Sequence, residues 1–266
     1  MISGKSRVYA IIGDPVDHVR APTVFNTRFE AAGADAVMVP LQVPLATLAR
    51  TLEGLRTLGN FGGCVVTAPL KGPCVSLCDA VEGNGSLAGA VNAIRRDPDG
   101  RLVGELFDGI GFVLGLKAHG IEPKGQRIFI AGAGGAGTAL AFALAGAGVA
   151  GITLYNRSRD KARSRAEGVS AAFPQCEVLV SGPDPRGHAI AVNATALGLS
   201  PDDPMPFEVD LLESSAIAAE VIMKPETTAM LQAAAARGCR IHQGRHMLDC
   251  QADALASFLK MPGAQP

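Results

Sequence analysis

The stretch Arg127-Ile-Phe-Ile-Ala-Gly132-Ala-Gly134-Gly-Ala-Gly137 decides the fold of this chain. A short apolar run, predicted to be a strand, is followed by the pattern GxGxxG and by an alanine-rich segment that predicts a helix to about residue 148. In such a unit the first glycine makes a tight turn and the second lets a pyrophosphate approach the backbone. The third lets the helix pack closely on the strand, and the helix N-terminus supplies N–H donors. The stretch predicts nucleotide binding, and the alternative is a simple glycine-rich turn.

The residues after the next predicted strand, 152–155, favour NADP over NAD. NAD-preferring folds place an Asp or Glu there, which accepts a hydrogen bond from the ribose 2′-hydroxyl. Here the chain reads Asn156-Arg157-Ser158-Arg159 and has no acid before Asp160. Guanidinium and hydroxyl groups bind a 2′-phosphate that a carboxylate would repel, although a solvated basic helix start would look the same. The expected cofactor contacts are Gly132, Ala133, Gly134, Gly135, Ala136, Gly137, Asn156, Arg157, Ser158 and Lys161.

Short β-branched runs alternate with Ala- and Leu-rich segments along the whole chain, which is typical of an α/β fold with parallel strands. Asp99-Gly100, within 95–101, predicts a hairpin turn, and 83–89 is expected to be a loop. Strands are predicted at 8–12, 36–40, 63–67, 90–95, 127–131, 152–155, 177–180, 189–193, 217–221 and 240–242. The pattern changes near residue 110. We therefore expect two α/β domains.

The composition excludes several classes of function. The 266 residues carry 24 Lys and Arg against 25 Asp and Glu, and 48% of them are hydrophobic. A near-neutral chain without a basic run lacks the charge that nucleic-acid and membrane-surface binding usually need. No apolar stretch is suited to span a membrane, and the start shows no signal peptide. We expect a globular cytoplasmic protein with a small-molecule partner, no nucleic-acid partner and no membrane partner.

Cysteine and histidine spacing predicts no metal site. The six cysteines form no CxxC pair, and we interpret them as small apolar side chains, although an even count permits disulfides. Helical spacing would bring His242 and His246 together, but 238–244 predicts a strand that ends in a turn. We therefore expect the two histidines not to share a helix face and no metal to bind.

A series of motifs runs through the chain. In order they are Gly13-Asp-Pro-Val-Asp-His18…Pro22, Val66-Thr67-Ala-Pro69-Leu-Lys71, Gly89-Ala-Val-Asn92, Gly104…Asp108-Gly-Ile-Gly111, Gly132–Gly137, Asn156-Arg157-Ser158, Asn193-Ala-Thr195-Ala-Leu-Gly198 and Met247-Leu-Asp-Cys-Gln251. Together they resemble the shikimate dehydrogenase family over nearly the whole chain. The resemblance implies a substrate-binding domain, 1–109 plus 240–266, and a Rossmann domain, 110–239, that binds NADP. It also implies an active site in the cleft between them, a last helix that returns to the first domain, and a monomer or homodimer.

By the same resemblance Lys71 and Asp108 form the catalytic pair. Hydride transfer between a secondary alcohol and NADP also moves a proton on or off the same oxygen, and a lysine beside a carboxylate can hold that oxygen and shuttle the proton. Thr67, Asn92 and Gln251 match positions that hydrogen-bond the hydroxyl-bearing side of the substrate ring, with ordinary loop hydrogen bonding as the alternative. The remaining expected cofactor contacts are Thr195 and Met223.

The carboxylate end of the substrate site departs from the family pattern. Where the family has His-Ser-x-Ser-Pro, this chain has His18-Val19-Arg20-Ala21-Pro22, so both hydroxyls that grip the carboxylate are absent. Two lost hydrogen bonds to a charged group cost about 3–6 kcal/mol, or on the order of 10²–10⁴ in kcat/KM. Arg20 would compensate only if it faced the site. Other positions where the family is polar and this chain is apolar are Val65, Leu106, Phe107 and Met223.

Three functions remain open. The first is an NADP-dependent dehydrogenase whose ring substrate carries a different group where the carboxylate sits, so that Val19, Ala21 and Phe107 line an altered site. The second is a true shikimate dehydrogenase that binds the carboxylate through Arg20 or backbone donors. The third is a non-catalytic NADP(H)-binding sensor or interaction protein. The retained Lys71 favours the first, with poor activity on shikimate itself.

Overall fold

The computed structural model describes residues 2–17 and 19–264, so His18 of the first motif lies outside the described residues. The chain forms two compact units, Met1–Phe107 with Ala252–Pro266 (unit 1) and Asp108–Gln251 (unit 2). Each unit contains one six-stranded sheet with helices, which confirms the predicted α/β class. Within the described ranges, no helix combines the length and the apolar character that a membrane span requires.

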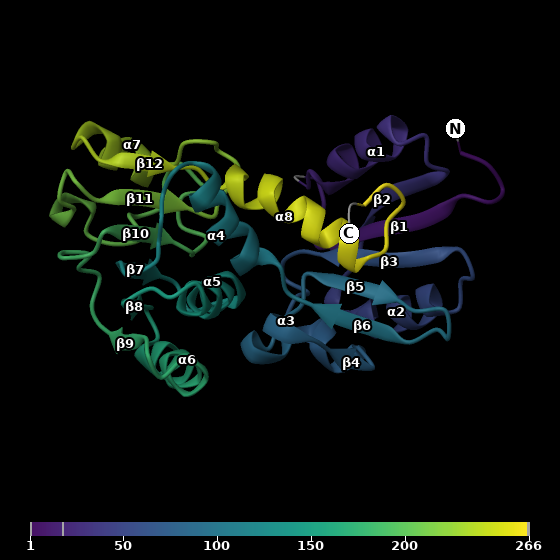
Figure 1. Ribbon diagram of the computed structural model, residues 1–266, viewed down its shortest axis with the longest axis horizontal. Helices are drawn as coiled ribbons and strands as arrows, with labels where there is room; N and C mark the ends of the chain where they lie inside the picture. Colours follow the sequence, from purple (N-terminus) through teal and green to yellow (C-terminus); the bar gives the residue numbers. More distant parts are fainter. Residues whose placement is uncertain (1, 18, 265–266) are drawn as a thin grey trace. The chain divides into compact units, whose positions relative to one another are not determined.

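Unit 1 contains a mixed sheet in the order β2-β1-β3-β5-β6-β4 (Figure 1). Its elements are β1 (Arg7–Gly13), α1 (Ala21–Ala31), β2 (Ala36–Gln42), η1 (Leu45–Thr47), α2 (Leu48–Arg56), β3 (Phe61–Val66), η2 (Pro73–Leu77), β4 (Ala80–Val81), α3 (Gly83–Ala88), β5 (Ala93–Arg96) and β6 (Leu102–Glu105). β1 pairs in parallel with β2 and β3, whereas β5 runs antiparallel to β3 and β6. The β5–β6 connection is the predicted hairpin, with Gly100 at φ +86°.

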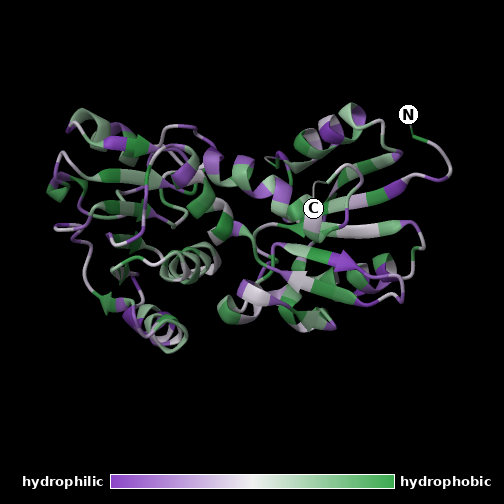
Figure 2. Cartoon of the chain, in the orientation of Figure 1, coloured by the Kyte–Doolittle hydropathy of each residue, from purple (hydrophilic) through white to green (hydrophobic). Residues whose placement is uncertain are grey.

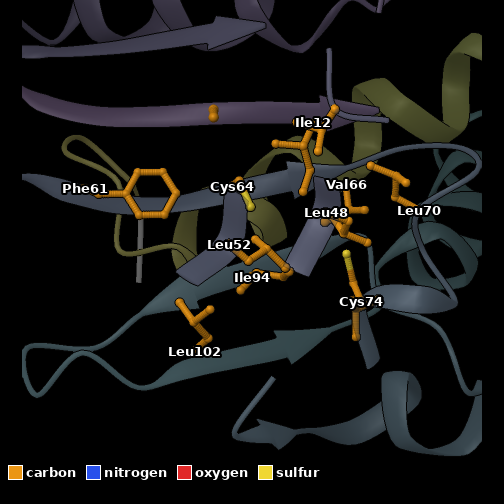
Figure 3. Close-up of a cluster of buried hydrophobic side chains, with 13 residues drawn as sticks. Ile12, Leu48, Leu52, Phe61, Cys64, Val66, Leu70, Cys74, Ile94 and Leu102 are labelled. Atoms are coloured by element: carbon orange, nitrogen blue, oxygen red, sulfur yellow. The ribbon is translucent and has the colours of Figure 1, made fainter. Parts of the chain in front are cut away.

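Apolar side chains from the sheet and from α2 and η2 form the core of unit 1 (Figure 3). Leu48 and Leu52 of α2 pack against residues of β1, β3 and β5 in this cluster. Cys64 and Cys74 lie in the same cluster, and burial raises the pKa of both thiols. None of the six cysteines forms a disulfide within the described residues, and the buried ones act here as small apolar side chains.

Residues 83–89, expected to be a loop, contain the short helix α3. Glycine-rich sequence has low helix propensity, which is why the local pattern misses this helix. The cause is a tertiary contact: the Glu105 carboxylate accepts a hydrogen bond from the Gly85 N–H at 2.9 Å and another from the Leu106 N–H at 2.7 Å. Burial raises the pKa of Glu105, and these backbone donors oppose the shift.

Unit 2 contains a fully parallel sheet in the order β12-β11-β10-β7-β8-β9 (Figure 1). Its elements are α4 (Asp108–Ala118), β7 (Arg127–Ala131), α5 (Gly135–Gly146), β8 (Gly151–Tyr155), α6 (Arg159–Ala172), β9 (Glu177–Val180), β10 (Ile190–Asn193), η3 (Val209–Leu211), β11 (Ile217–Glu220), α7 (Ala229–Ala236), β12 (Arg240–His242) and the first part of α8 (Arg245–Phe258). Hydrophobic residues follow its strands (Figure 2). This is the Rossmann strand order, and it reverses between β7 and β10, where such sheets bind ligands.

The division into units differs from the predicted one, which placed 240–266 with the first domain. β12 pairs with β11, so residues 240–242 belong to the second sheet. The first turns of α8 pack on α4, because Gly111 has no side chain: a Cβ there would stand 2.5 Å from the Met247 carbonyl oxygen. The chain passes into unit 1 only at Ala252, within α8.

In the glycine turn after β7, the backbone atoms of neighbouring segments lie too close together for any side chain between them. A Cβ on Gly137 would stand 1.9 Å from the Gly132 carbonyl oxygen. Gly132 itself has φ +113°, and a Cβ there would stand 2.6 Å from the Ala194 carbonyl oxygen. The first and third glycines of the motif therefore hold α5 against the ends of β7 and β10.

A buried polar cluster joins the carboxyl ends of β10 and β11. The Glu220 carboxylate accepts hydrogen bonds from Asn193 Nδ2 and Thr228 Oγ1, each at 3.0 Å, and from the N–H groups of Val221 and Ile222. Glu220 is fully buried, and this burial raises its pKa from the ordinary 4.5 to about 7 although the hydrogen bonds oppose the shift.

We expect Gly137→Ala to destabilise unit 2 by about 3 kcal/mol, since its methyl group overlaps a backbone oxygen that cannot rotate away. Gly135→Ala is the matched control, because a Cβ there meets nothing within 4 Å. Urea denaturation of both variants measures the effect. Equal midpoints for the two variants would show that the close packing is not needed for stability.

The raised pKa of Glu220 predicts a pH-dependent stability. Because the folded pKa of about 7 exceeds the unfolded value near 4.5, the contribution is fully present below pH 4.5 and is lost as the pH rises through about 7. Glu220→Gln removes this dependence, so the variant should gain about 3 kcal/mol relative to the native protein between pH 5 and pH 8.

Urea denaturation at several pH values follows the gap between the two proteins. Glu213→Gln, at an exposed position, is the control and should track the native protein. A gap between Glu220→Gln and the native protein that stays constant with pH contradicts the prediction.

Candidate nucleotide and substrate sites

The N-terminus of α5 is open to a ligand. Gly134 is its N-cap, in an extended conformation at φ −78° and ψ −168°, and Thr138 Oγ1 donates to the Gly134 carbonyl oxygen at 2.8 Å. Apart from the adjacent backbone of the same turn, no atom of the described residues lies within 4 Å of the Cβ position of Gly134 or Gly135. The first N–H groups of α5, which have no partner within the helix, therefore suit the pyrophosphate of a dinucleotide together with the helix dipole.

Asn156 connects the glycine turn to the end of β8. Its Oδ1 accepts a hydrogen bond from the Ala133 N–H at 3.2 Å, and its Nδ2 donates to the Ser158 carbonyl oxygen at 3.0 Å. The Gly132 N–H donates to the Tyr155 carbonyl oxygen at 2.7 Å. The side chain expected to touch the cofactor therefore also sets the shape of the turn.

The basic residues after β8 are exposed. Arg157, Ser158 and Lys161 all lie on the surface, and Ser158 Oγ caps α6 by accepting from the Lys161 N–H at 3.4 Å. The nearby acid, Asp160, pairs with Arg163 at 3.4 Å. Exposed cations at this strand end, with the nearby carboxylate paired to another residue, are suited to a 2′-phosphate.

Thr195 lies just after β10, and Met223 lies just after β11. The Asn193 Oδ1 atom accepts from the Thr195 N–H at 3.0 Å and from its hydroxyl at 2.7 Å, and Thr195 Oγ1 in turn accepts from the Leu197 N–H at 3.0 Å. Met223 is half-buried just beyond β11. Sequence reasoning did not single out Asn193 beyond quoting it in a motif, yet it holds this loop.

The polar residues expected at the reacting end of the substrate lie in and beside the turn after β3. Thr67 and Lys71 are both half-buried. Thr67 packs so closely on the end of β1 that a Cβ on Gly13 would stand 2.3 Å from its methyl carbon. The Lys71 carbonyl oxygen accepts from the Val91 N–H at 3.0 Å, which fixes the backbone of the turn.

Asn92 is buried, and its Oδ1 accepts from the Phe107 N–H at 2.9 Å. The side-chain oxygen of Asn92 therefore makes an ordinary hydrogen bond to the loop, which is the alternative to substrate binding given above. Asp108 follows Phe107 directly and is the buried first residue of α4 in unit 2. Gln251 is also buried in unit 2, against α4: a Cβ on Gly111 would stand 2.6 Å from the Gln251 Cβ.

The positions that lost polar groups are buried or half-buried. Ala21 is buried in the first turn of α1, and Val19 and Arg20 are half-buried just before it. Leu106 is buried, and the Phe107 ring packs on Phe258 with centroids 5.4 Å apart. The side chains at 106 and 107 are part of a hydrophobic core.

The structure brings His242 and His246 together in spite of the turn between β12 and α8. Their ring centroids are 4.9 Å apart, and His119 lies 5.5 Å from the first and 3.7 Å from the second. Burial, and then the charges of His246, His119 and Arg240, lower the pKa of His242 to about 4. Sequence reasoning missed His119 because no local pattern connects it to the other two.

Known proteins share this chain's sequence and fold. A family model for the shikimate dehydrogenase substrate binding domain matches residues 11–94. A shikimate dehydrogenase (NADP(+)) of Rubrobacter xylanophilus is 38% identical over 251 residues, which span 93% of this chain and 88% of the relative.

Two solved structures have the same fold over almost their whole length. Shikimate 5-dehydrogenase of Thermus thermophilus, in complex with NADP(H) and shikimate, gives a TM-score of 0.87 at 30% identity, covering 97% of this chain and 95% of the other. The ligand-free 5-ketofructose reductase of a Gluconobacter strain gives 0.86 at 29%, covering 97% and 94%. Sequence, fold and motifs agree, and the chain belongs to the shikimate dehydrogenase family.

Proposed function

We propose that this protein is an NADP-dependent dehydrogenase that interconverts a ring secondary alcohol and its ketone, and that shikimate itself is a poor substrate. The observation that carries the proposal is a contrast within unit 1. Thr67, Lys71 and Asn92 keep the polar groups that the reacting end needs, whereas Ala21 and Phe107 are apolar at positions that match polar ones in the family.

Unit 2 supports the choice of cofactor. The open first turn of α5 would hold the pyrophosphate through backbone N–H groups. Arg157, Ser158 and Lys161 would bind the 2′-phosphate, with Thr195 and Met223 as further contacts. When bound, NADP⁺ supplies the acceptor for a hydride from the alcohol carbon.

The remaining chemistry belongs to Lys71 and Asp108. As the alcohol carbon loses a hydride, its oxygen must lose a proton, and a lysine beside a carboxylate provides both a hydrogen-bond donor and a proton acceptor for that oxygen. Asn92 supports this arrangement, because its hydrogen bond to the Phe107 N–H fixes the backbone next to Asp108.

The other end of the substrate meets surfaces that do not favour a charge. The family has serines where this chain has Val19 and Ala21. A carboxylate bound here would lack both serine hydroxyls as hydrogen-bond donors and would lose about 3–6 kcal/mol of binding free energy. A neutral substituent incurs no such loss. A neutral substrate is compatible with this fold, because one protein that shares it is named for 5-ketofructose, a ketosugar without a carboxylate.

The substrate preference is tested by steady-state oxidation with NADP⁺ and NAD⁺ on shikimate, quinate and cyclic polyols that lack a carboxylate. We expect kcat/KM for shikimate to fall on the order of 10²–10⁴ below that for the best carboxylate-free ring, with NADP⁺ preferred. The double variant Val19→Ser with Ala21→Ser should raise kcat/KM for shikimate by at least about tenfold and leave the neutral rings unchanged.

The variant Arg20→Ala tests the other explanation, in which Arg20 binds the substrate carboxylate. If Arg20 binds the carboxylate instead of the serines, the variant raises KM for shikimate and the native protein already oxidises shikimate efficiently. That pair of results overturns the proposed preference and leaves the family assignment intact.

The catalytic role of Lys71 has its own test. Lys71→Ala should lower turnover of every ring substrate by more than about 10²-fold, since general acid–base catalysis contributes that much, while NADPH affinity stays the same. Lys5→Ala, at an exposed position of unit 1, is the control. Steady-state rates and NADPH fluorescence titrations measure both quantities. Unchanged turnover contradicts the assignment, and NADPH binding without turnover of any ring in the native protein supports the sensor alternative.

A further inference from the structure

Three histidines from three separate segments meet in unit 2. His119 follows α4, His242 ends β12, and His246 lies in the first turn of α8. One ring nitrogen from each lies within 4.8 Å of the corresponding atoms of the other two. We propose that this trio binds a divalent transition-metal ion, Zn²⁺ in particular.

The buried member of the trio has an unused nitrogen. His242 is 2% exposed, and its ring stands edge-on to Phe112 with centroids 5.9 Å apart. Its Nε2 atom is buried and has no hydrogen-bond partner among the residues that the structure describes. Leaving such a group unpaired is costly, whereas a metal ion would use its lone pair.

The exposed member is oriented for coordination. His119 Nδ1 lies 2.8 Å from the Gly115 carbonyl oxygen, which can only accept, so the proton is assigned to Nδ1. The Nε2 atom therefore carries the lone pair that a metal requires. A backbone carbonyl on the far nitrogen is the usual partner of a zinc-bound histidine.

Gly115 also makes room for the third histidine. A Cβ at this position would stand 3.1 Å from the His246 carbonyl carbon and oxygen, and 3.4 Å from the His246 Cβ. The missing side chain thus lets α8 approach α4 closely, while the Gly115 carbonyl orients His119. One residue on α4 accordingly serves two of the three ligands.

The dimensions suit zinc after a small closure. Tetrahedral zinc with Zn–N bonds of about 2.0–2.1 Å brings its nitrogens to about 3.3 Å of one another, so the rings would close by about 1.5 Å at most. Three imidazoles leave a fourth position for water, and the exposed His119 provides access from solvent. Among the neighbouring charges, Arg245 is paired with Glu226 at 2.7 Å, and Arg240 donates to the His119 carbonyl oxygen.

The trio is separate from Asp108, the proposed catalytic residue of unit 2. Eleven helical steps separate Asp108, at the start of α4, from His119 beyond its end, or about 16 Å at 1.5 Å per residue. An ion there would bind three segments together: the end of α4, the edge strand β12 and the start of α8. We therefore assign it a stabilising role.

Calorimetric titration of ZnCl₂ into tag-free, chelator-stripped protein tests the proposal. We expect one equivalent to bind with a micromolar or tighter dissociation constant and the melting temperature to rise. Co²⁺ should give the intense visible absorption of a tetrahedral nitrogen site, and Mg²⁺ should not bind. His119→Gln and His246→Ala should each weaken Zn²⁺ binding by at least about tenfold.

His188→Gln is the matched control, since both ring nitrogens of His188 already have partners elsewhere in unit 2. Circular dichroism confirms that each variant is folded. Absence of Zn²⁺ binding to the native protein overturns the proposal, as does binding that His119→Gln and His246→Ala leave unchanged. Neither result bears on the dehydrogenase assignment.

Discussion

The close approach of Gly137 to the Gly132 carbonyl oxygen is the constraint on which the nucleotide site depends. Because a Cβ on Gly137 would stand 1.9 Å from that oxygen, α5 begins as near to the end of β7 as two backbones can lie. The unpaired N–H groups of the first helical turn therefore face the edge where the strand order of the sheet reverses. The pyrophosphate binding that we propose at this edge would follow from how a helix packs on a strand, and would need no charged side chain. In this proposal the exposed cations after β8 would add only the distinction between NADP and NAD.

Asparagine side chains next to the strands fix the conformation of the loops by hydrogen bonds. Asn156 holds the Ala133 N–H, Asn193 holds the Thr195 N–H, and Asn92 holds the Phe107 N–H. Each uses its side-chain oxygen to satisfy a backbone donor that has no strand partner. Leaving such a donor buried and unpaired costs about 1–3 kcal/mol, so these residues have a structural reason to be asparagine whether or not they touch a ligand. Their presence in a motif is therefore weaker evidence for binding than the presence of Lys71, whose ammonium group has no acceptor to offer a backbone donor.

The sequence predicted those parts of the molecule that are set by local pattern. The parallel strands, the β5–β6 hairpin and the glycine turn all follow from short runs of residues, and the structure has them. The helix α3 could not be predicted, because the Glu105 carboxylate stabilises a glycine-rich segment from twenty residues away in the chain. The assignment of 240–251 to unit 2 depends on which neighbour β12 pairs with, and His119 joins two distant histidines only through helix packing. Each of these is a long-range contact, which a pattern of hydrophobic and polar residues does not encode.

Helix α4 shows how these long-range contacts are organised. Three of its glycines admit three different neighbours: Gly109 faces the Ala139 carbonyl of α5, Gly111 faces Gln251, and Gly115 faces His246. Helix α4 is therefore packed against α5 near its start at Asp108 and against the histidine trio near its end. A larger residue at any of the three positions would push α4 away from a neighbour and shift Asp108 with it, since a helix moves nearly as a rigid rod. The polar-to-apolar changes at Val19 and Ala21 lie outside this packed helix, whereas Phe107 directly precedes it. The substrate preference that we propose can therefore depend on positions 19 and 21 without disturbing the packing of α4 in unit 2.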